Sequence, residues 1–386
     1  MFQSISARKI LCRKYVFVHV AEAAGGVERY LYALLKNSDS QKIENYLITS
    51  QHYEMGKFKK YVSGEYQLQM AHAACFKNDK ATVKQIKKIV RQIKLDIVYA
   101  HSTKAGALTR IALMGMHIPV IYNPHGWAFN MAQSKKKELA YRLIEKVQIP
   151  FTKKVVCISE AEMQSAMQKH ICSKDKIKII PNGIDFDLLD KVQPVTRRDL
   201  GIPEDAFVVG QIGRLSEQKS PDVFVEMAEK IKKEIPNSFF VMVGDGNLEA
   251  EIRRLIKMKG LEDSFLITGW VDNPTGYLNC FDVATLLSRW EGFGLALVEY
   301  MYCGVPLVST KVDAIPYVVD DGIDGLLVEP NSANEAAQAA IRIYGDSVLA
   351  AKLVTNGFNI AKYKYDIRRV IKQTQQLYQD VLSRSL

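Results

Sequence analysis

Short apolar runs alternate with amphipathic stretches along the whole chain. In the first half, we expect strands at residues 15–20, 46–49, 97–100, 120–122, 155–158 and 177–180. Apolar residues at helical spacing between these runs predict helices at 27–36 and 81–94. Apolar strands that alternate with helices are typical of a parallel sheet covered by helices on both faces.

The alternation pauses at residues 187–206, a polar segment with two prolines that we interpret as an interdomain linker. It then resumes with expected strands at 207–212, 239–243, 265–268, 283–287 and 306–309, and expected helices near 221–234, 247–258, 295–303 and 333–344. The last stretch, 366–386, places apolar residues on one helical face: Ile367, Val370, Ile371, Leu377, Tyr378, Val381 and Leu382. The pattern predicts an α/β chain of two doubly wound domains with a terminal helix.

Composition narrows the class of protein. The chain has 386 residues, of which 48% are apolar and 24% charged, which excludes a disordered, collagenous or disulfide-scaffold protein. The apolar run near the N-terminus is short and is followed by Glu22, so we expect a first strand there rather than a signal peptide. No run reaches the length of about 18 apolar residues that a membrane span needs. Six scattered cysteines without a CxxC pair fit a reducing cytosol.

Charge is distributed unevenly along the chain. The net charge of +10 divides into +14 for residues 1–190 and −4 for residues 191–386. A basic half fits nucleic acid, an anionic membrane or an acidic small molecule. We expect peripheral docking on an anionic cytoplasmic membrane, the alternative being solvated helix faces that only keep the protein in solution. The two candidate basic patches are Lys80, Lys84, Lys87, Lys88, Arg91 and Lys94, and Lys135, Lys136, Lys137, Arg142 and Lys146.

The motif with the most candidate ligand-binding residues is RWEGFGLALVEYMYCGVPLVST at 289–310, between two expected strands. Gly292 and Gly294 bracket Phe293 just before a predicted helix that starts at Leu295, so the backbone can approach a ligand closely. The free N–H groups at the start of that helix suit a diphosphate. Glu299 lies near the second turn of this helix, where it can accept hydrogen bonds from a ribose.

Glu291 lies in the loop before these glycines, where it can bind a sugar hydroxyl. A second loop, after the expected strand 207–212, carries Gly213, Arg214 and Lys219. Its two cations can neutralise the charge that develops on a departing diphosphate. The alternatives are a tight turn with a surface carboxylate for the first loop and a solvated basic loop for the second.

The first domain offers fewer candidates. Gly25 and Gly26 open its first predicted helix and can bring the helix N-terminus close to phosphates or an acceptor. His125 follows the expected strand 120–122, at a carboxyl edge where doubly wound sheets bind ligands. We interpret the other histidines, including His19, His101 and His170, as packing or surface residues, although His101 also ends a strand.

Taken in order, these motifs resemble those of the family 4 glycosyltransferases. The matching segments are GGVERY at 25–30, NPHGW at 123–127, CISE at 157–160, PNGID at 181–185, GRLSEQKS at 213–220, VGDG at 243–246, the motif at 289–310 and DGIDGLLVEP at 321–330. The resemblance implies the GT-B fold, with two Rossmann-like domains facing a cleft. It implies an acceptor domain at 1–186, a nucleotide-sugar donor domain at 187–361, and a terminal helix at 362–386 that returns to the first domain.

The resemblance also implies an activity. It is that of a retaining enzyme that moves a hexose or N-acetylhexosamine from a nucleotide sugar, most commonly UDP-linked, to a lipid-linked acceptor in surface polysaccharide synthesis. Arg214, Lys219, Glu291 and His125 are the implied catalytic residues, with front-face attack and no assigned general base. No metal or other cofactor is expected, because the DxD sequence at Asp185 and Asp187 belongs to the interdomain segment of this family.

Two departures from the family pattern leave the sugar and the base open. Residues 312–317 replace a common Gly-Gly-x-Pro-Glu element, and Tyr300 and Tyr302 stand where small residues are frequent.

Two other functions remain alternatives. A nucleotide-sugar epimerase of the same fold would need carboxylates from both domains, and Glu291 has no evident partner in the first half. A nucleic-acid-binding protein would need aromatic residues among its basic stretches, and the basic helix at 80–94 has none.

Overall fold

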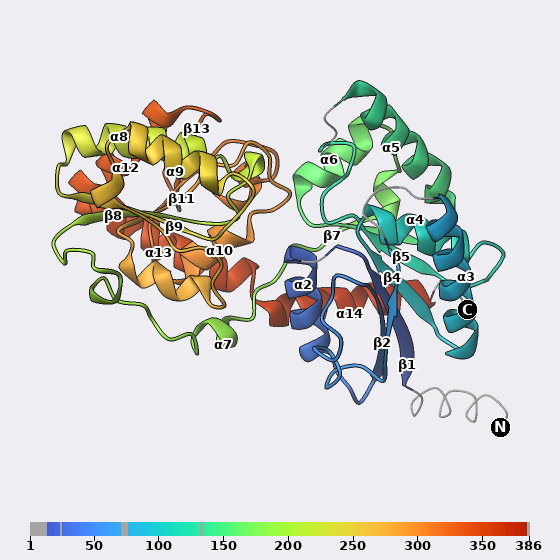
Figure 1. Cartoon of the computed structure of the whole chain (residues 1–386). Coiled ribbons are helices and arrows are strands. Elements are labelled where there is room, and N and C mark those ends of the chain that lie inside the picture. Colours follow the sequence, from blue (N-terminus) through green and yellow to red (C-terminus); the bar gives the residue numbers. More distant parts are fainter. Residues whose placement is uncertain (1–13, 24, 71–75, 132–133, 384–386) are drawn as a thin grey trace. The chain divides into compact units, whose positions relative to one another are not determined.

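The computed structural model describes residues 14–23, 25–70, 76–131 and 134–383. Its contacts divide the chain into two compact units (Figure 1). Unit 1 comprises the described residues of Met1–Gly183 and Ile367–Leu386, and unit 2 comprises Ile184–Asp366. Cys12 and Cys75 lie outside the described residues, and the other four cysteines carry free thiols.

Unit 1 contains a parallel sheet of seven strands in the order β3-β2-β1-β4-β5-β6-β7. The strands are β1 (Tyr15–Ala21), β2 (Ile43–Ser50), β3 (Gly64–Leu68), β4 (Ile97–His101), β5 (Val120–Asn123), β6 (Lys154–Cys157) and β7 (Ile177–Ile179). The helices are α2 (Gly26–Lys36), α3 (Phe76–Gln92), α4 (Thr103–Ala112), α5 (Lys135–Gln148), α6 (Glu160–Gln168) and α14 (Ile367–Ser383).

Helices cover both faces of this sheet, as the apolar runs predict. Successive strand residues point to opposite faces, so Phe17 of β1 packs in one core with α2 and α14, and Val18 packs in another with α3 and α4 (Figure 1). The predicted apolar face of the terminal helix is buried in the first of these cores, with Leu382 partly buried at its end. At Gly183 an added Cβ would lie 2.9 Å from the Ile367 Cα, so only glycine permits this close approach to the start of α14.

Unit 2 contains a second parallel sheet, of six strands in the order β10-β9-β8-β11-β12-β13. The strands are β8 (Phe207–Ile212), β9 (Ser238–Val243), β10 (Phe265–Ile267), β11 (Val283–Leu286), β12 (Leu307–Thr310) and β13 (Leu326–Val328). The helices are α7 (Phe186–Leu189), α8 (Pro221–Glu234), α9 (Glu249–Met258), α10 (Leu295–Tyr302), α11 (Ile315–Val318), α12 (Ala333–Gly345) and α13 (Ser347–Lys364). The predicted α/β class with two doubly wound sheets is therefore confirmed.

The polar segment 187–206 is not a free linker, which corrects our interpretation. It packs within unit 2, where the Val195 N–H donates to the Gly276 carbonyl at 3.0 Å. The Arg197 guanidinium donates to the carbonyl oxygens of Cys280 at 3.1 Å and Ala206 at 3.0 Å. These hydrogen bonds and the buried side chain of Ile202 hold the segment in unit 2.

Each sheet has one place where the strand order reverses direction. In unit 1 this point lies between β1 and β4, and in unit 2 it lies between β8 and β11. Loops that leave the carboxyl ends of two such strands diverge and leave room for a ligand. The residues that follow these four strands are therefore the ones to examine for a site.

Candidate active site

In unit 2, the loops after β8 and β11 meet through an ion pair between Lys219 and Glu291. The Lys219 Nζ donates to the Glu291 Oε2, and both side chains are largely buried. Two further hydrogen bonds join the same loops, since the Arg289 N–H donates to the Gln218 carbonyl at 2.8 Å and the Gln218 amide donates to the Trp290 carbonyl at 3.0 Å. The structure thus brings together two of the predicted catalytic residues, at the edge where a ligand is expected.

Glu291 is held from two other sides by residues that the sequence did not single out. The Ser288 hydroxyl donates to Oε2 at 3.3 Å, and the backbone N–H of Glu291 donates to the Asp313 carboxylate at 2.9 Å. Asp313 belongs to the segment 312–317 that departs from the family pattern. This segment therefore holds the backbone of Glu291 in place of the more common glycine-rich element.

The loop that carries Lys219 is shaped by the turn after β9. The Leu215 N–H donates to the Asp245 carbonyl at 2.7 Å, and the Leu248 N–H donates to the Leu215 carbonyl at 3.1 Å. A Cβ added at Gly246 would lie 2.3 Å from the Leu215 oxygen, so glycine is required for this backbone-to-backbone contact. The VGDG motif is thus the strand-to-helix turn that supports the basic loop.

Gly294 caps α10 with a φ of +83°, a conformation that favours glycine, and its carbonyl accepts from the Leu297 N–H at 2.9 Å. Helix α10 then starts at Leu295, and its first N–H groups have no partner within the helix. The Phe293 ring packs against Tyr365 with centroids 5.5 Å apart. Gly292 is half-buried beside it, and Glu299 is buried one turn along α10.

The two tyrosines that replace small residues have structural partners. The buried Tyr300 hydroxyl accepts from the Ile212 N–H at 3.0 Å and donates to the Thr285 carbonyl at 3.3 Å, which ties the ends of β8 and β11 together. Burial raises the pKa of this phenol. The Tyr302 hydroxyl donates to Asp190 at 2.9 Å, and its ring stacks on Phe186 at 3.9 Å. Both tyrosines therefore stabilise the scaffold of the site.

Two residues of the basic loop contribute differently from Lys219. The Gly213 N–H donates to the Val243 carbonyl at 3.0 Å, so it continues the pairing of β8 with β9. The Arg214 side chain is exposed and, within the described part of the chain, makes no hydrogen bond or ion pair. The structure thus does not bring Arg214 to Glu291.

In unit 1, Gly25 precedes α2 with a φ of +78°, and Gly26 is the first residue of that helix. His125 has a φ of +50°, and its backbone N–H donates to the Asn123 side chain at 2.9 Å. The Tyr30 and His125 rings pack edge to face, with their centroids 5.0 Å apart. Residues of α2 and of the loop after β5 therefore fix the imidazole at the carboxyl edge of the sheet.

Sequence reasoning missed the residues behind His125. Its Nε2 lies 3.1 Å from the Nδ1 of His101, and the Nε2 of His101 lies 3.2 Å from the Nδ1 of His19. The Nε2 of His19 lies 3.3 Å from the Asn45 Oδ1. Burial lowers the pKa of His19 to about 4 and that of His125 to about 3, and it lowers the pKa of His101 well below its usual value. The position of His101 at a strand end was the signal that could have revealed this chain.

Asp185 and Asp187, which spell the DxD sequence, lie just before and within the short helix α7. Among the residues that the structure describes, no three or more His, Cys, Asp or Glu side chains are grouped so that they could hold a metal ion.

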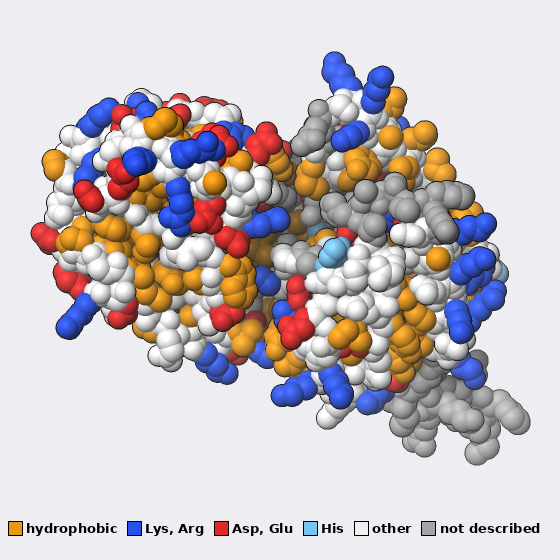
Figure 2. Space-filling model, in the orientation of Figure 1, with side chains coloured by type: hydrophobic (Ala, Val, Ile, Leu, Met, Phe, Trp, Pro, Cys, Tyr) orange, Lys and Arg blue, Asp and Glu red, His pale blue; other side chains and the backbone are white. Residues whose placement is uncertain are grey.

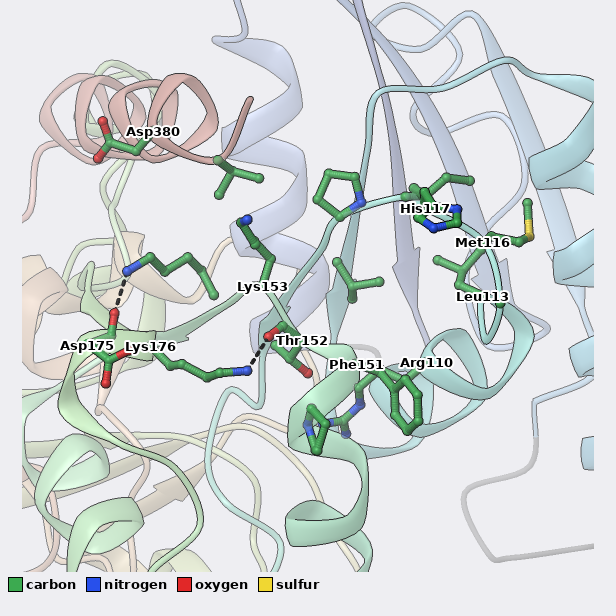
Figure 3. Close-up of a pocket in the computed structure, with 17 residues that line it drawn as sticks. Arg110, Leu113, Met116, His117, Phe151, Thr152, Lys153, Asp175, Lys176 and Asp380 are labelled. Atoms are coloured by element: carbon green, nitrogen blue, oxygen red, sulfur yellow. Dashed lines mark hydrogen bonds between the residues drawn. The ribbon is translucent and has the colours of Figure 1, made fainter. Parts of the chain in front are cut away.

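Unit 1 also contains a pocket of about 620 Å³ away from these residues (Figure 3). It lies at the amino ends of β5 and β6, the edge opposite to the one where doubly wound sheets bind ligands. Several of its cations are already engaged, since Lys176 donates to the Thr152 carbonyl at 2.9 Å and Lys154 donates to the Asp175 carbonyl. We therefore assign this pocket no part in the candidate site.

Comparison with known proteins identifies the family. The profile of the family described as "Glycosyltransferase Family 4" matches residues 24–188, and that of "Glycosyl transferases group 1" matches residues 192–360. A UDP-Gal:α-D-GlcNAc-diphosphoundecaprenol α-1,3-galactosyltransferase of Escherichia coli is 32% identical over 291 residues, which cover 71% of this chain and 74% of that protein. The chain belongs to the family 4 glycosyltransferases. This glycosyltransferase is also 26% identical over 308 residues to an N-acetyl-α-D-glucosaminyl L-malate synthase of Bacillus anthracis, with 79% and 80% of the two chains covered.

Solved structures give the same fold for this glycosyltransferase. HepE of Anabaena, crystallised with UDP, matches with a TM-score of 0.79 and 21% identity over 95% of this chain and all of that one. Sucrose-phosphate synthase of Thermosynechococcus elongatus matches with a TM-score of 0.81 and 20% identity, covering 96% of this chain and 100% of that one. The predicted GT-B fold and the family resemblance are therefore confirmed.

Proposed function

We propose that this glycosyltransferase moves a hexose or N-acetylhexosamine from a UDP-sugar to a lipid-linked acceptor, with retention of configuration, in the synthesis of a surface polysaccharide. The observation that carries the proposal is the Lys219–Glu291 pair at the strand ends of β8 and β11, beside the glycine-capped start of α10. A cation and free helix N–H groups are the partners that a departing diphosphate needs. The carboxylate can bind a hydroxyl of the transferred sugar.

The comparisons support the classes of donor and acceptor in this proposal. The Escherichia coli relative is named as using UDP-galactose and an acceptor linked to diphosphoundecaprenol. The fold neighbour HepE was crystallised with UDP, with UDP and glucose, and with UDP-glucose. In the mechanism we propose, Lys219 neutralises the leaving diphosphate, Glu299 binds the ribose, and the leaving phosphate accepts the acceptor proton. In unit 1, His125 and the glycines at 25–26 are the residues that we propose bind substrate.

A thermal screen of nucleotide sugars tests the donor class. A ligand that binds only the folded state stabilises it by about 2.7 kcal/mol at a hundred times its dissociation constant. We expect UDP and UDP-sugars to raise the melting temperature, and ADP or GDP to raise it less. We also expect Glu299→Gln to reduce the shift, because its buried carboxylate would no longer accept both ribose hydroxyls. If no nucleotide changes the melting temperature, the donor site is assigned wrongly.

Catalysis is expected to need no divalent metal, because Lys219 supplies fixed positive charge where the diphosphate leaves. We expect full activity after exhaustive treatment with EDTA. Activity that disappears with EDTA and returns with manganese would contradict this expectation. The variant Asp187→Asn would then show whether the DxD sequence is responsible.

Helix α5 supports the membrane part of the proposal. Glu145 is the only residue of α5 that is buried, while Leu139, Leu143 and Val147 are each more than 60% exposed. Lys135, Lys136 and Lys137 form its first turn, and Figure 2 shows apolar side chains beside cations on this part of unit 1. Within the described ranges, no helix is both long enough and apolar enough to cross a bilayer. A helix that combines exposed apolar residues with lysines can lie in a membrane interface.

We therefore propose that α5 is the main contact with the cytoplasmic membrane surface and that the lysines of α3 add long-range attraction. Each cation near an anionic surface contributes about 1 kcal/mol and is screened within a Debye length. Apolar side chains that enter the interface add a contribution that salt does not remove. Binding through α5 would bring the protein to a lipid-linked acceptor.

Cosedimentation with vesicles tests this surface. We expect binding to anionic vesicles at low salt, much weaker binding to neutral ones, and release of most of the bound protein by added salt. Replacing Lys135, Lys136 and Lys137 with Gln should weaken binding roughly 100-fold, at about 1 kcal/mol per charge. The matched variant with Lys84, Lys87 and Lys88 replaced by Gln removes the same charge from α3 and should weaken binding less. Equal partitioning onto neutral and anionic vesicles, or no binding at low salt, would favour an acceptor in solution.

A further inference from the structure

Two buried histidines, the partly buried His125 and Asn45 form a line across the sheet of unit 1. Asn45 lies on β2, His19 on β1, His101 at the end of β4 and His125 after β5, which is the spatial order of these strands. Each side chain lies within 3.3 Å of the next. A chain of hydrogen bonds therefore runs across four neighbouring strands to the ring of His125, which the proposed function places at the active site.

The donor and acceptor atoms of Asn45 set the direction of the hydrogen bonds along this line of side chains. Its Oδ1 faces His19 and can only accept, while its Nδ2 donates to the Ser38 hydroxyl at 3.0 Å. His19 must then carry its proton on Nε2, which leaves its Nδ1 to accept. His101 in turn must carry its proton on Nε2 and accept at Nδ1, and the same argument places the proton of His125 on Nε2.

The chain works in this way only if all three rings are neutral, since an imidazolium donates from both nitrogens. His19 and His101 are buried beneath α2 and α14 and His125 is partly buried, and loss of solvation disfavours the charged form of each ring. The titratable groups near them are the phenols of Tyr30, Tyr99 and Tyr378, whose pKa values are raised by burial. Among the described residues, no carboxylate stabilises a charged ring. The Asn45 amide, whose oxygen can only accept, thus determines the proton positions along this line of hydrogen bonds.

We propose that Asn45 is a positioning residue that acts through His19 and His101 to hold His125 in its Nε2–H tautomer, so that the Nδ1 of His125 accepts a hydrogen bond from a sugar hydroxyl. Among the described residues, the Nδ1 of His125 has no hydrogen-bond partner. The asparagine at one side of the sheet therefore determines whether the active-site imidazole donates or accepts. The tautomer of His125 follows from the hydrogen bonds alone. That its ligand is a sugar hydroxyl rests on the proposed function.

NMR spectroscopy can test the tautomer directly. In protein labelled with ¹⁵N in its histidine rings, long-range ¹H–¹⁵N correlations distinguish a protonated ring nitrogen from an unprotonated one. We expect His19, His101 and His125 each to carry a single proton, on Nε2, at pH 7. The signals are assigned by comparison with single variants such as His125→Gln. A His125 ring protonated at Nδ1, or at both nitrogens, would overturn the proposal without any variant of Asn45.

Removing the acceptor tests the role of Asn45. We expect Asn45→Leu to give a mixture of tautomers at His125 and to lower kcat about fivefold, the worth of one ordinary hydrogen bond, with little change in the KM of the donor. The control Thr49→Val removes a buried hydroxyl from the same strand, outside the chain, and should leave the tautomers unchanged. If Asn45→Leu does not fold, His19→Gln interrupts the chain one residue later and should have the same effect.

Two results distinguish the inference from the proposed function. If the tautomers of His125 are the same in Asn45→Leu as in the unsubstituted protein, the inference is wrong, whatever the activity. If the tautomers change as expected but the unsubstituted protein transfers no sugar, the chain of histidines stands and the proposed function fails.

Discussion

Replacing Lys219 with Ala is expected to lower turnover by about 100-fold or more, the cost of losing one preorganised electrostatic donor. Lys219 is the cation that contacts Glu291 where β8 and β11 end, and its backbone carbonyl accepts from the Gln211 amide at 2.9 Å. The loop is therefore preorganised before a ligand arrives. Lys219 stabilises charge that develops only as the diphosphate leaves. The variant should therefore lower kcat by a larger factor than it raises the KM for the donor. Steady-state kinetics with the preferred UDP-sugar measures both.

A matched control for this variant lies on α8. Lys233 also pairs with a glutamate, Glu229, at 2.9 Å, but its side chain is 70% exposed. Lys233→Ala removes the same charge and the same kind of pair, and it should leave turnover unchanged because exposed pairs contribute little. Normal turnover in a folded Lys219→Ala protein would exclude Lys219 from the catalytic site.

Replacing Arg110 with Leu is expected to lower the free energy of unfolding of unit 1 by about 3–5 kcal/mol, the cost of leaving one partner of a buried ion pair alone. The Arg110 guanidinium donates to Glu145 at 2.9 Å, and both side chains are almost completely buried. The Tyr122 hydroxyl donates to the other carboxylate oxygen at 2.7 Å. Because Glu145 is the one buried residue of α5, this variant should also loosen the helix that we propose meets the membrane.

Urea denaturation followed through Trp127, which is buried in unit 1, measures this loss in a background where Trp270 and Trp290 are replaced by Phe. The control Arg142→Leu removes a half-exposed partner of Glu138 on α5 and should cost less than about 1 kcal/mol. The double variant Arg110→Met/Glu145→Leu should regain most of the stability, because it leaves no unpaired buried charge. A double variant no more stable than Arg110→Leu would show that the loss comes from packing.

The fold could be predicted wherever burial follows the local apolar pattern. Strand β8 begins and ends at the predicted residues, because each of its six residues is buried. Strand β3 was missed, because it lies at the edge of the sheet and only its last residue is buried. Helix α5 was also missed, since it buries a glutamate and exposes its leucines. The sequence rule assigns apolar residues to the buried face of a helix, so it fails for a helix whose apolar residues are exposed to solvent.

The candidate site could be predicted in part. Lys219 and Glu291 are 72 positions apart, and the expectation that loops after neighbouring strands meet was enough to propose one site for them. The line from Asn45 to His125 could not be found in this way. Its members lie on three strands and in the loop after a fourth, and only the sheet order and register show that they are neighbours. Arg214 was assigned with Lys219 from the sequence, but in the structure Lys219 pairs with Glu291 and the Arg214 side chain is exposed.

Product analysis distinguishes sugar transfer from isomerisation of the nucleotide sugar. The enzyme is incubated with the UDP-sugar that stabilises it most and with a diphosphoundecaprenol-linked N-acetylglucosamine, and the products are separated and identified. We expect UDP to be released in equal amount to a new glycosidic bond of the same anomeric configuration as the donor. An isomerised nucleotide sugar, with no UDP released and no bond formed, would exclude the proposed transfer and indicate an epimerase.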